Sequence, residues 1–143
     1  MKRAERGQTT VFFTLILTGL IVMTAVAIEI GRIVYARGEV GKAADAAALA
    51  AAARINVPLY RQTGQVVFLP DVNGNAQEVA GSNSAYLAKR SIPVTVTGIS
   101  IDENAQMVRV SVAADLSSLM PAALPFGGQY TVTGYAQSRL DKK

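Results

Sequence analysis

Residues 9–28 read TTVFFTLILTGLIVMTAVAI, and this stretch decides the fold because it contains no charged side chain. A helix needs about twenty apolar or small residues to cross the hydrocarbon core of a bilayer. Within lipid, every backbone N–H and C=O group must find a partner inside the segment, which a single span achieves only as a helix. The sequence therefore predicts a transmembrane helix over 9–28 that anchors and orients the rest of the chain.

Basic residues dominate the short segment before this helix. Lys2, Arg3 and Arg6 precede the apolar stretch, and only Glu5 opposes them. Positively charged flanks tend to stay on the cytoplasmic side of a membrane. We therefore expect residues 1–7 to form a cytoplasmic basic leader of a single-pass protein in the cytoplasmic (inner) membrane, with the C-terminal region outside the cytoplasm.

Three fates of the apolar helix are open. The helix is retained whole as an anchor, or the leader is cut off between Gly7 and Gln8 and the helix stays. The third fate is removal as a secretory signal peptide near Ala27, where Ala25-Val26-Ala27 has the small-residue cleavage pattern. The apolar run is longer than a usual signal core, and helical patterning continues past the site, so we predict an anchor.

The helical pattern continues beyond the apolar stretch into an alanine-rich run over 43–53. Alanine is the strongest helix former, and Pro58 opposes continuation because its ring clashes and it lacks an N–H. We expect one helix over 8–55, whose part after residue 28 is amphipathic and lies outside the membrane. Its stripe recurs at spacings of three and four and comprises Ile30, Ile33, Val34, Arg37, Val40, Ala44, Ala47, Ala48, Ala51 and Ile55.

Small residues spaced by four mark candidate helix-packing positions, because they let two backbones approach closely. These positions are Ala27, Gly31, Ala43, Ala44, Ala47, Ala48 and Ala51. The pattern fits packing between molecules and also fits packing against the chain's own C-terminal domain.

Two charged residues stand at the edge of the apolar stretch. Glu29 and Arg32 are three residues apart and can pair on one helix face. They are candidates for a polar contact that fixes the register between helices, or for a simple interfacial ion pair.

Residues 56–143 predict one small α+β domain. An Asn73-Gly74 turn and a cap at Asn75 indicate a short helix from Ala76 to about Arg90. Three strands of an antiparallel sheet follow, marked by Ile92, Val94 and Val96, by Val108, Val110 and Val112, and by Tyr130, Val132 and Tyr135. A sheet this small needs the long helix to bury its apolar face.

Several positions predict irregularities within the strands and the connections between them. Gly98 falls at a shift of the apolar phase, which predicts a β-bulge, and Gly134 interrupts the third strand. Residues 102–105 form a polar hairpin loop, and residues 115–120 predict a short helical turn before Pro121.

The composition excludes several classes of function. The chain has no cysteine and no histidine, so it lacks the commonest general base and the commonest metal ligands. Its net charge is +4, without a basic run interleaved with aromatics that would indicate nucleic-acid binding. We expect no enzyme activity, no catalytic residue, no metal, no cofactor and no nucleic-acid partner.

Residues 6–54 resemble the TadE/TadG-like family, whose members are associated with assembly of Flp (tight-adherence) pili. The matching positions are Arg6-Gly7-Gln8, the apolar stretch, EIGRIVYAR over 29–37 and AADAAALAAA over 43–52. Type IV pilins and the TadE-like branch usually carry a glutamate five residues into the mature helix, where this chain, counted from Gln8, has Phe12. The TadG-like N-terminal region is therefore the closer match, although the chain is too short for that branch's large adhesion domain.

The resemblance implies a pilin-like, membrane-anchored structural or accessory protein of Flp pilus assembly or secretion, with a role in cell adhesion. Its partners would be the membrane and other pilin-like or pilus-assembly subunits, in a homo-oligomer or filament. Two alternative functions are also compatible with the sequence. The chain is a major filament-forming subunit in an extracellular pilus, or it is a secreted binding module released near Ala27.

Overall fold

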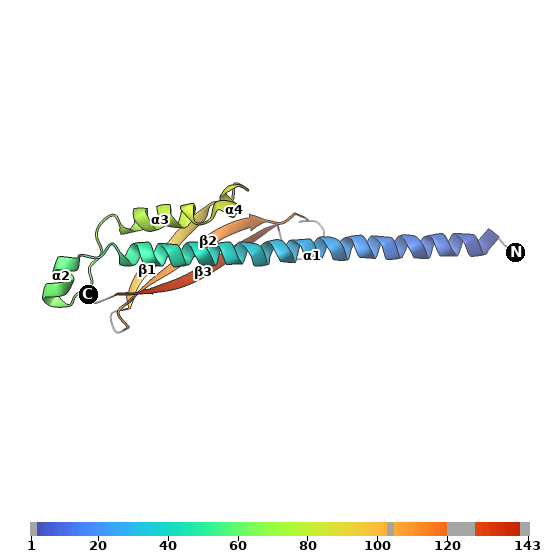
Figure 1. The fold of residues 1–143 in the computed structure, drawn as a ribbon. Coiled ribbons are helices and arrows are strands. Elements are labelled where there is room, and N and C mark those ends of the chain that lie inside the picture. The colour runs from blue at the N-terminus through green and yellow to red at the C-terminus, as the bar shows by residue number, and fades with distance from the viewer. Residues whose placement is uncertain (1–2, 103–104, 120–127, 141–143) are drawn as a thin grey trace.

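The computed structural model describes residues 3–102, 105–119 and 128–140, with side chains from Gln8 onward. The elements follow in the order α1 (Arg3–Ala52), α2 (Val57–Thr63), α3 (Val72–Ser82), α4 (Ala85–Ala88), β1 (Val94–Asp102), β2 (Met107–Ser117) and β3 (Gln129–Arg139) (Figure 1). The predicted fold class is confirmed: a long N-terminal apolar helix precedes a small domain with short helices and a three-stranded antiparallel sheet.

Helix α1 dominates the shape of the molecule. It has 50 residues and is therefore about 75 Å long. Its N-terminal half projects away from the domain, and its C-terminal half lies along the sheet (Figure 1). One element thus forms both an isolated rod and part of the folded core.

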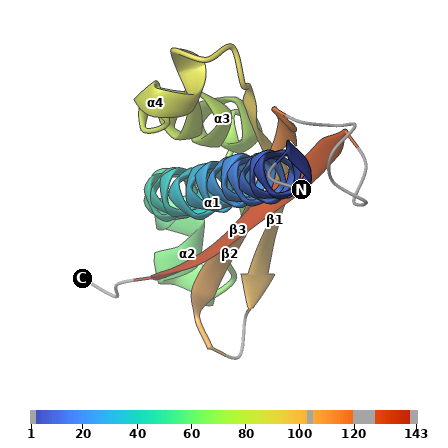
Figure 2. The same cartoon turned by 90° about the vertical axis from the view of Figure 1, so that its right-hand side faces the viewer.

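Helices cover one face of the sheet, whose strand order is β1-β2-β3. The C-terminal half of α1 packs over β2 and β3, and α3 packs beside α1 and over β1 (Figure 2). The buried strand residues alternate with exposed polar ones, as expected for a sheet with one solvated face. The core of the sheet comprises Val94, Val108, Val110, Val112, Ala114, Leu116, Val132 and Ala136.

The register of the sheet confirms the predicted bulge. The pairing of β1 with β2 shifts between Val96 and Gly98. The pairing of β2 with β3 is regular over its whole length, and Gly134 lies opposite Val112 without a break. The predicted interruption of the third strand at Gly134 is therefore wrong, because this glycine serves helix packing instead.

The predicted helix from Ala76 to Arg90 is two helices in the structure. Helix α3 begins earlier, at Val72, so the Asn73-Gly74 turn and the Asn75 cap are wrong. Burial of Val72 under α1 extends the helix by one turn. Helix α3 then ends because Asn83 and Ser84 donate side-chain hydrogen bonds to carbonyl oxygens of its last turn, before α4 starts.

Helix α2 was not predicted. Helix α1 ends at Ala52 rather than at residue 55. Pro58 opens α2 because a proline tolerates the first helical turn, and Asn56 Oδ1 caps this turn by accepting from Leu59 N at 3.1 Å. Gly64 closes α2 with φ of 75°, a conformation that favours glycine.

Strand β2 is longer than the sequence indicated. The predicted helical turn over 115–120 is wrong for residues 115–117, which continue β2 and pair with β3. The Thr131 hydroxyl donates to Asp115 Oδ1 at 2.6 Å and so joins the two strands on their outer face. The remainder of that predicted turn from residue 120 lies outside the described residues, as do positions 103–104 of the predicted hairpin loop.

Candidate functional site

The exposed apolar surface of α1 is the most distinctive feature of the molecule. In the described chain, one helix is long and apolar enough to cross a membrane, and no residue of its most apolar window is buried. The exposed apolar side chains in this half are Val11, Phe12, Phe13, Leu15, Ile16, Leu17, Leu20, Ile21, Val22, Met23 and Ile28. A contiguous apolar surface of this extent is expected to be covered by lipid or protein.

The candidate leader cleavage site lies inside this helix. Gly7 and Gln8 belong to α1, which runs through them without interruption. Cleavage between these residues stays a prediction.

The alanine positions of α1 face the chain's own domain. Ala43, Ala44, Ala47 and Ala51 have no exposed surface, and Ala48 is 1% exposed. They belong to the same core cluster as Ala76 and Ala80 of α3 and the valines of β2. Small side chains here let α1 lie close to the sheet and to α3, so the molecule occupies this face itself.

The stripe predicted for the outer half of α1 is partly wrong. Val40 and the alanines from Ala44 onward are buried, but Ile30, Val34 and Arg37 are exposed. The face that meets the domain instead passes through Ala36 and Glu39. Spacings of three and four fit several neighbouring stripes, and only contact with the sheet selects one of them.

Glu29 and Arg32 join α1 to the end of β2. Arg32 Nη1 donates to Glu29 Oε2 at 3.0 Å, and the Glu29 side chain is only 5% exposed. The same Oε2 atom accepts from Leu119 N, and Arg32 Nη2 donates to Ser117 O, both at 3.4 Å. The two side chains that were candidates for a contact between helices thus make contacts within the chain.

A second ion pair lies about three helical turns further from the apolar half of α1. Lys42 Nζ donates to Glu39 Oε1 at 2.9 Å, and Glu39 is buried while Lys42 is largely exposed. The hydrogen bond from Lys42 to Glu39 and the negative charge of Glu39 raise the pKa of the Lys42 amine above its usual value of 10.5. The pair therefore keeps a buried carboxylate compensated at neutral pH.

Ala27 and Gly31, the remaining candidate packing positions, are exposed. A Cβ atom added to Gly31 or to Gly38 would meet nothing within 4 Å. Glycine in a helix interior costs about 1 kcal/mol relative to alanine, and no contact in the described chain requires it at these two positions. The face of α1 that carries Ala27, Gly31 and Gly38 is therefore exposed helix surface among the described residues.

Three further contacts were missed at the sequence level. Tyr35 of α1 meets Tyr86 of α4 with ring centroids 4.2 Å apart, and the Arg90 guanidinium lies 3.9 Å from the Tyr86 centroid. The Gln77 side chain of α3 donates to Val94 O at 2.7 Å and accepts from Val96 N at 2.8 Å. The Gln77 amide thus pairs with the backbone of β1 in the way that a neighbouring strand would. A glycine inside a strand, such as Gly134, is the one signal that could have indicated close backbone approach.

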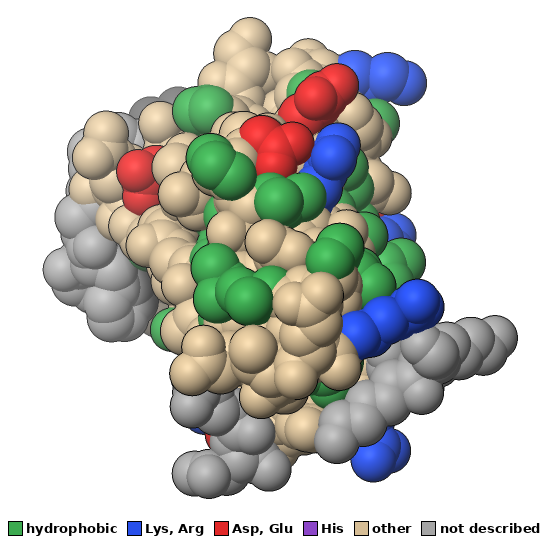
Figure 3. Space-filling view, turned by 90° about the vertical axis from the view of Figure 1, so that its left-hand side faces the viewer, with side chains coloured by type: hydrophobic (Ala, Val, Ile, Leu, Met, Phe, Trp, Pro, Cys, Tyr) green, Lys and Arg blue, Asp and Glu red, His purple; other side chains and the backbone are tan. Residues whose placement is uncertain are grey.

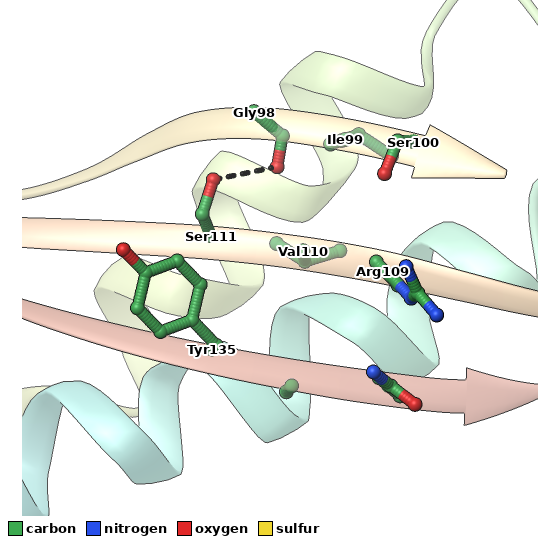
Figure 4. A pocket seen from close by; sticks show the side chains of 9 residues that line it. Gly98, Ile99, Ser100, Arg109, Val110, Ser111 and Tyr135 are labelled. Carbon is green, nitrogen blue, oxygen red and sulfur yellow. Dashed lines mark hydrogen bonds between the residues drawn. The ribbon is translucent and has the colours of Figure 1, made fainter. Parts of the chain in front are cut away.

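The outer face of the sheet carries a shallow depression between the three strands (Figure 4). The Ser111 hydroxyl donates to Gly98 O at 3.3 Å, and a carbonyl oxygen is no general base. Arg109 is paired with Asp102 at 2.7 Å, and Tyr135 is 77% exposed on this face. The depression holds no pair of groups poised for nucleophilic or acid–base chemistry.

The surface at the end of the domain opposite the projecting half of α1 is mixed in character. The end of the domain farthest from the N-terminus shows apolar, basic and acidic side chains interspersed (Figure 3). No group of three or more acidic side chains that could hold a metal ion occurs in the ranges that the structure describes. The exposed apolar half of α1 and its junction with the domain therefore stand out as the candidate site.

Comparison with known proteins relates the long helix to a protein family. Residues 7–54 match the family model described as putative Flp pilus-assembly TadE/G-like, which agrees with the resemblance seen over residues 6–54. The matched region covers α1 almost completely. Neither the curated proteins nor the solved structures compared with this chain gave a match.

Proposed function

We propose that this chain, whose residues 7–54 match the TadE/G-like Flp pilus-assembly family, is a pilin-like accessory protein anchored in the cytoplasmic membrane by α1. In this proposal the N-terminus lies in the cytoplasm, and the α+β domain lies outside it. Its partners are other pilin-like or pilus-assembly subunits. The protein acts by packing and positioning rather than by catalysis.

The division of α1 into two halves supports the proposal most directly. Residues 8–28 leave their large apolar side chains exposed, whereas residues 36–51 form part of the domain core. The free energy of exposing so many apolar side chains to water is unfavourable by about 25 cal/mol per Å². One half of α1 is apolar on all sides, and the other half is packed into the domain. Such a helix is suited to anchor the domain to a membrane.

Fractionation of cells that express the full chain tests the anchor. We expect the protein in the membrane fraction, with an intact mass of the whole chain or of a chain that starts at Gln8. A charge in the span, Leu17→Arg, should reduce membrane insertion, since arginine at a helix centre costs about 3 kcal/mol. A soluble mature chain that starts at Ile28 would overturn the proposal.

A soluble mature chain that starts at Ile28 would favour the alternative of a secreted binding module. The buried residues of α1 begin at Glu29, so a cut after Ala27 leaves every core contact of the domain in place. Abundance of the chain in filaments sheared from cells would instead favour the major subunit. A low copy number in membranes with Flp pili, and loss of pili when the chain is deleted, would support the accessory role.

A further inference from the structure

The domain begins at the end of the apolar span, with no spacer between them. Glu29 is the first residue beyond the span and accepts from Leu119 N at 3.4 Å, and Arg32 bonds Ser117 O at the end of β2. If residues 9–28 fill the hydrocarbon core, as the proposed anchor requires, the end of β2 lies at the level of the lipid headgroups. Leu119 exposes 60% of its surface at this level.

Helix α4 lies on the same end of the domain. Tyr35 is about 10 Å along α1 from Ile28, and its ring contacts Tyr86 of α4. Figure 1 shows α4 at the end of the domain nearest to the projecting half of α1, and Figure 2 shows it beside α1 when viewed from the N-terminus. The chain turn that follows α4 therefore stands close to the surface of any bilayer that α1 crosses.

This turn carries two consecutive basic residues. Lys89 and Arg90 are exposed, and Arg90 is stacked on Tyr86, which holds its guanidinium in place. The headgroup layer extends about 5–7 Å beyond the hydrocarbon core, and charges act over a Debye length of about 8 Å in physiological salt. Lysine and arginine side chains reach several ångströms toward such a surface, and tyrosines favour the same interface.

We propose that Lys89 and Arg90 bind the phosphate groups of anionic phospholipids in the leaflet next to the domain, and so seat the domain on the membrane. This inference rests on the proposed anchor. The positive charges of Lys89 and Arg90 favour anionic lipid as the partner. Because α1 runs without interruption from the apolar span into the domain, the lipid headgroups lie within reach of these two side chains. Asp115, on the outer sheet face near the same end, bonds the Thr131 hydroxyl on β3 rather than a group on α4.

The proposed contact has a mechanical consequence. Transmembrane helices tilt by about 20° on average, and attraction of α4 to the headgroups would select the direction of the tilt. The outer face of the sheet, with Tyr135, would then be held in one orientation toward neighbouring subunits.

The absence of cysteine allows a direct test on the full chain. A spin label at Ala88→Cys, exposed on α4, reports its distance from paramagnetic chelator lipids in nanodiscs. We expect stronger relaxation of this label in phosphatidylglycerol than in phosphatidylcholine. The charge variant Lys89→Gln/Arg90→Gln should remove the gain, with roughly a fivefold change in the ratio of seated to unseated molecules for each charge.

A matched variant and two further labels complete the design. Arg61→Gln/Arg139→Gln removes the same number of charges elsewhere and should leave the gain intact, and a label at Gln62→Cys on α2 should not respond to the lipid. Equal relaxation of the Ala88 label in both lipids, or a gain that survives loss of Lys89 and Arg90, would overturn the inference. A label at Leu17→Cys that is open to water-borne reagents would instead refute the anchor.

Discussion

Gly134 of β3 lies directly against the backbone of α1 at Val40. A Cβ atom placed on Gly134 would stand 2.9 Å from Val40 O, closer than real Cβ atoms come to other atoms, and 3.1 Å from Gly41 N, which is tighter than most real contacts. These atoms belong to a helix backbone and cannot rotate away as a side chain would. Absence of a side chain at Gly134 therefore sets how closely α1 lies on the sheet.

Gly134→Ala should destabilise the domain by about 1–3 kcal/mol, because α1 must move off the sheet to admit one methyl group. Thermal unfolding of the full chain in detergent, followed by near-UV circular dichroism, measures the change. Gly38→Ala is the matched control in α1. Its Cβ would meet nothing within 4 Å, and it should stabilise the helix by about 0.5–1 kcal/mol. Equal stability of the two variants would contradict the close approach.

Ala47→Leu should also destabilise the domain, by about 1–3 kcal/mol, because Ala47 is fully buried and three further carbon atoms must be accommodated. The same exchange at Ala53, which is exposed just past the end of α1, should change the free energy of unfolding by less than about 0.5 kcal/mol. If the alanine face served only contacts between molecules, the isolated chain would tolerate both changes equally.

Two truncated chains distinguish the roles of the halves of α1. Residues 29–143 retain the buried part of α1 and should fold and melt cooperatively in water. Residues 56–143 lose the buried alanines and Val40, so the sheet should lose its cover and fail to fold. Circular dichroism during heating decides, and a cooperative melt of 56–143 alone would show that the sheet does not depend on α1.

Glu29→Gln should loosen the end of β2. The carboxylate accepts from Arg32 and from Leu119 N while nearly buried, and hydrogen bonds to charged groups contribute about 1.5–3 kcal/mol. Amide exchange at Leu119 should become about tenfold faster or more. Asp45→Asn, exposed on α1, is the control and should leave this amide unchanged. Normal pili in cells that carry Glu29→Gln would exclude a register contact between helices.

The ion pair of Lys42 with Glu39 predicts a loss of stability at alkaline pH. Glu39 raises the pKa of Lys42 above 10.5 in the folded chain. The folded chain therefore binds the proton of the Lys42 amine more tightly than the unfolded chain does. The contribution is complete below pH 10.5 and is lost as the pH rises through the folded pKa. The difference in melting temperature between the natural chain and Lys42→Gln should be constant up to about pH 10 and shrink above it. A difference that grows at alkaline pH would be inconsistent with a raised pKa.

The sequence predicted elements whose signal is local. The apolar stretch over 9–28 and the alanine run predicted the long helix, because helix propensity and hydropathy act within a few turns. Alternating valines predicted the strands, and the phase shift at Gly98 predicted the bulge that the register shows. The candidate pair of Glu29 and Arg32 also followed from spacing alone.

Errors arose where packing overrides local signals. The Asn73-Gly74 dipeptide is typical of a turn, yet it lies in α3 because burial of Val72 extends the helix. Residues 115–117 extend β2 because β3 supplies partners for their backbone. Ile30 and Val34 are more apolar than Ala36, but Ala36 is buried because it lies on the face of α1 that packs against the domain.

By itself the sequence determined that this protein has one long, apolar, N-terminal helix attached to a small α+β domain. Hydropathy and helix propensity are properties of consecutive residues and need no distant partner. Only the tertiary structure decided which face of α1 meets the domain, why Gly134 lacks a side chain, and that Glu29 holds Leu119, 90 residues away. These relationships depend on contacts between segments far apart in the chain, whose free energy no local pattern contains.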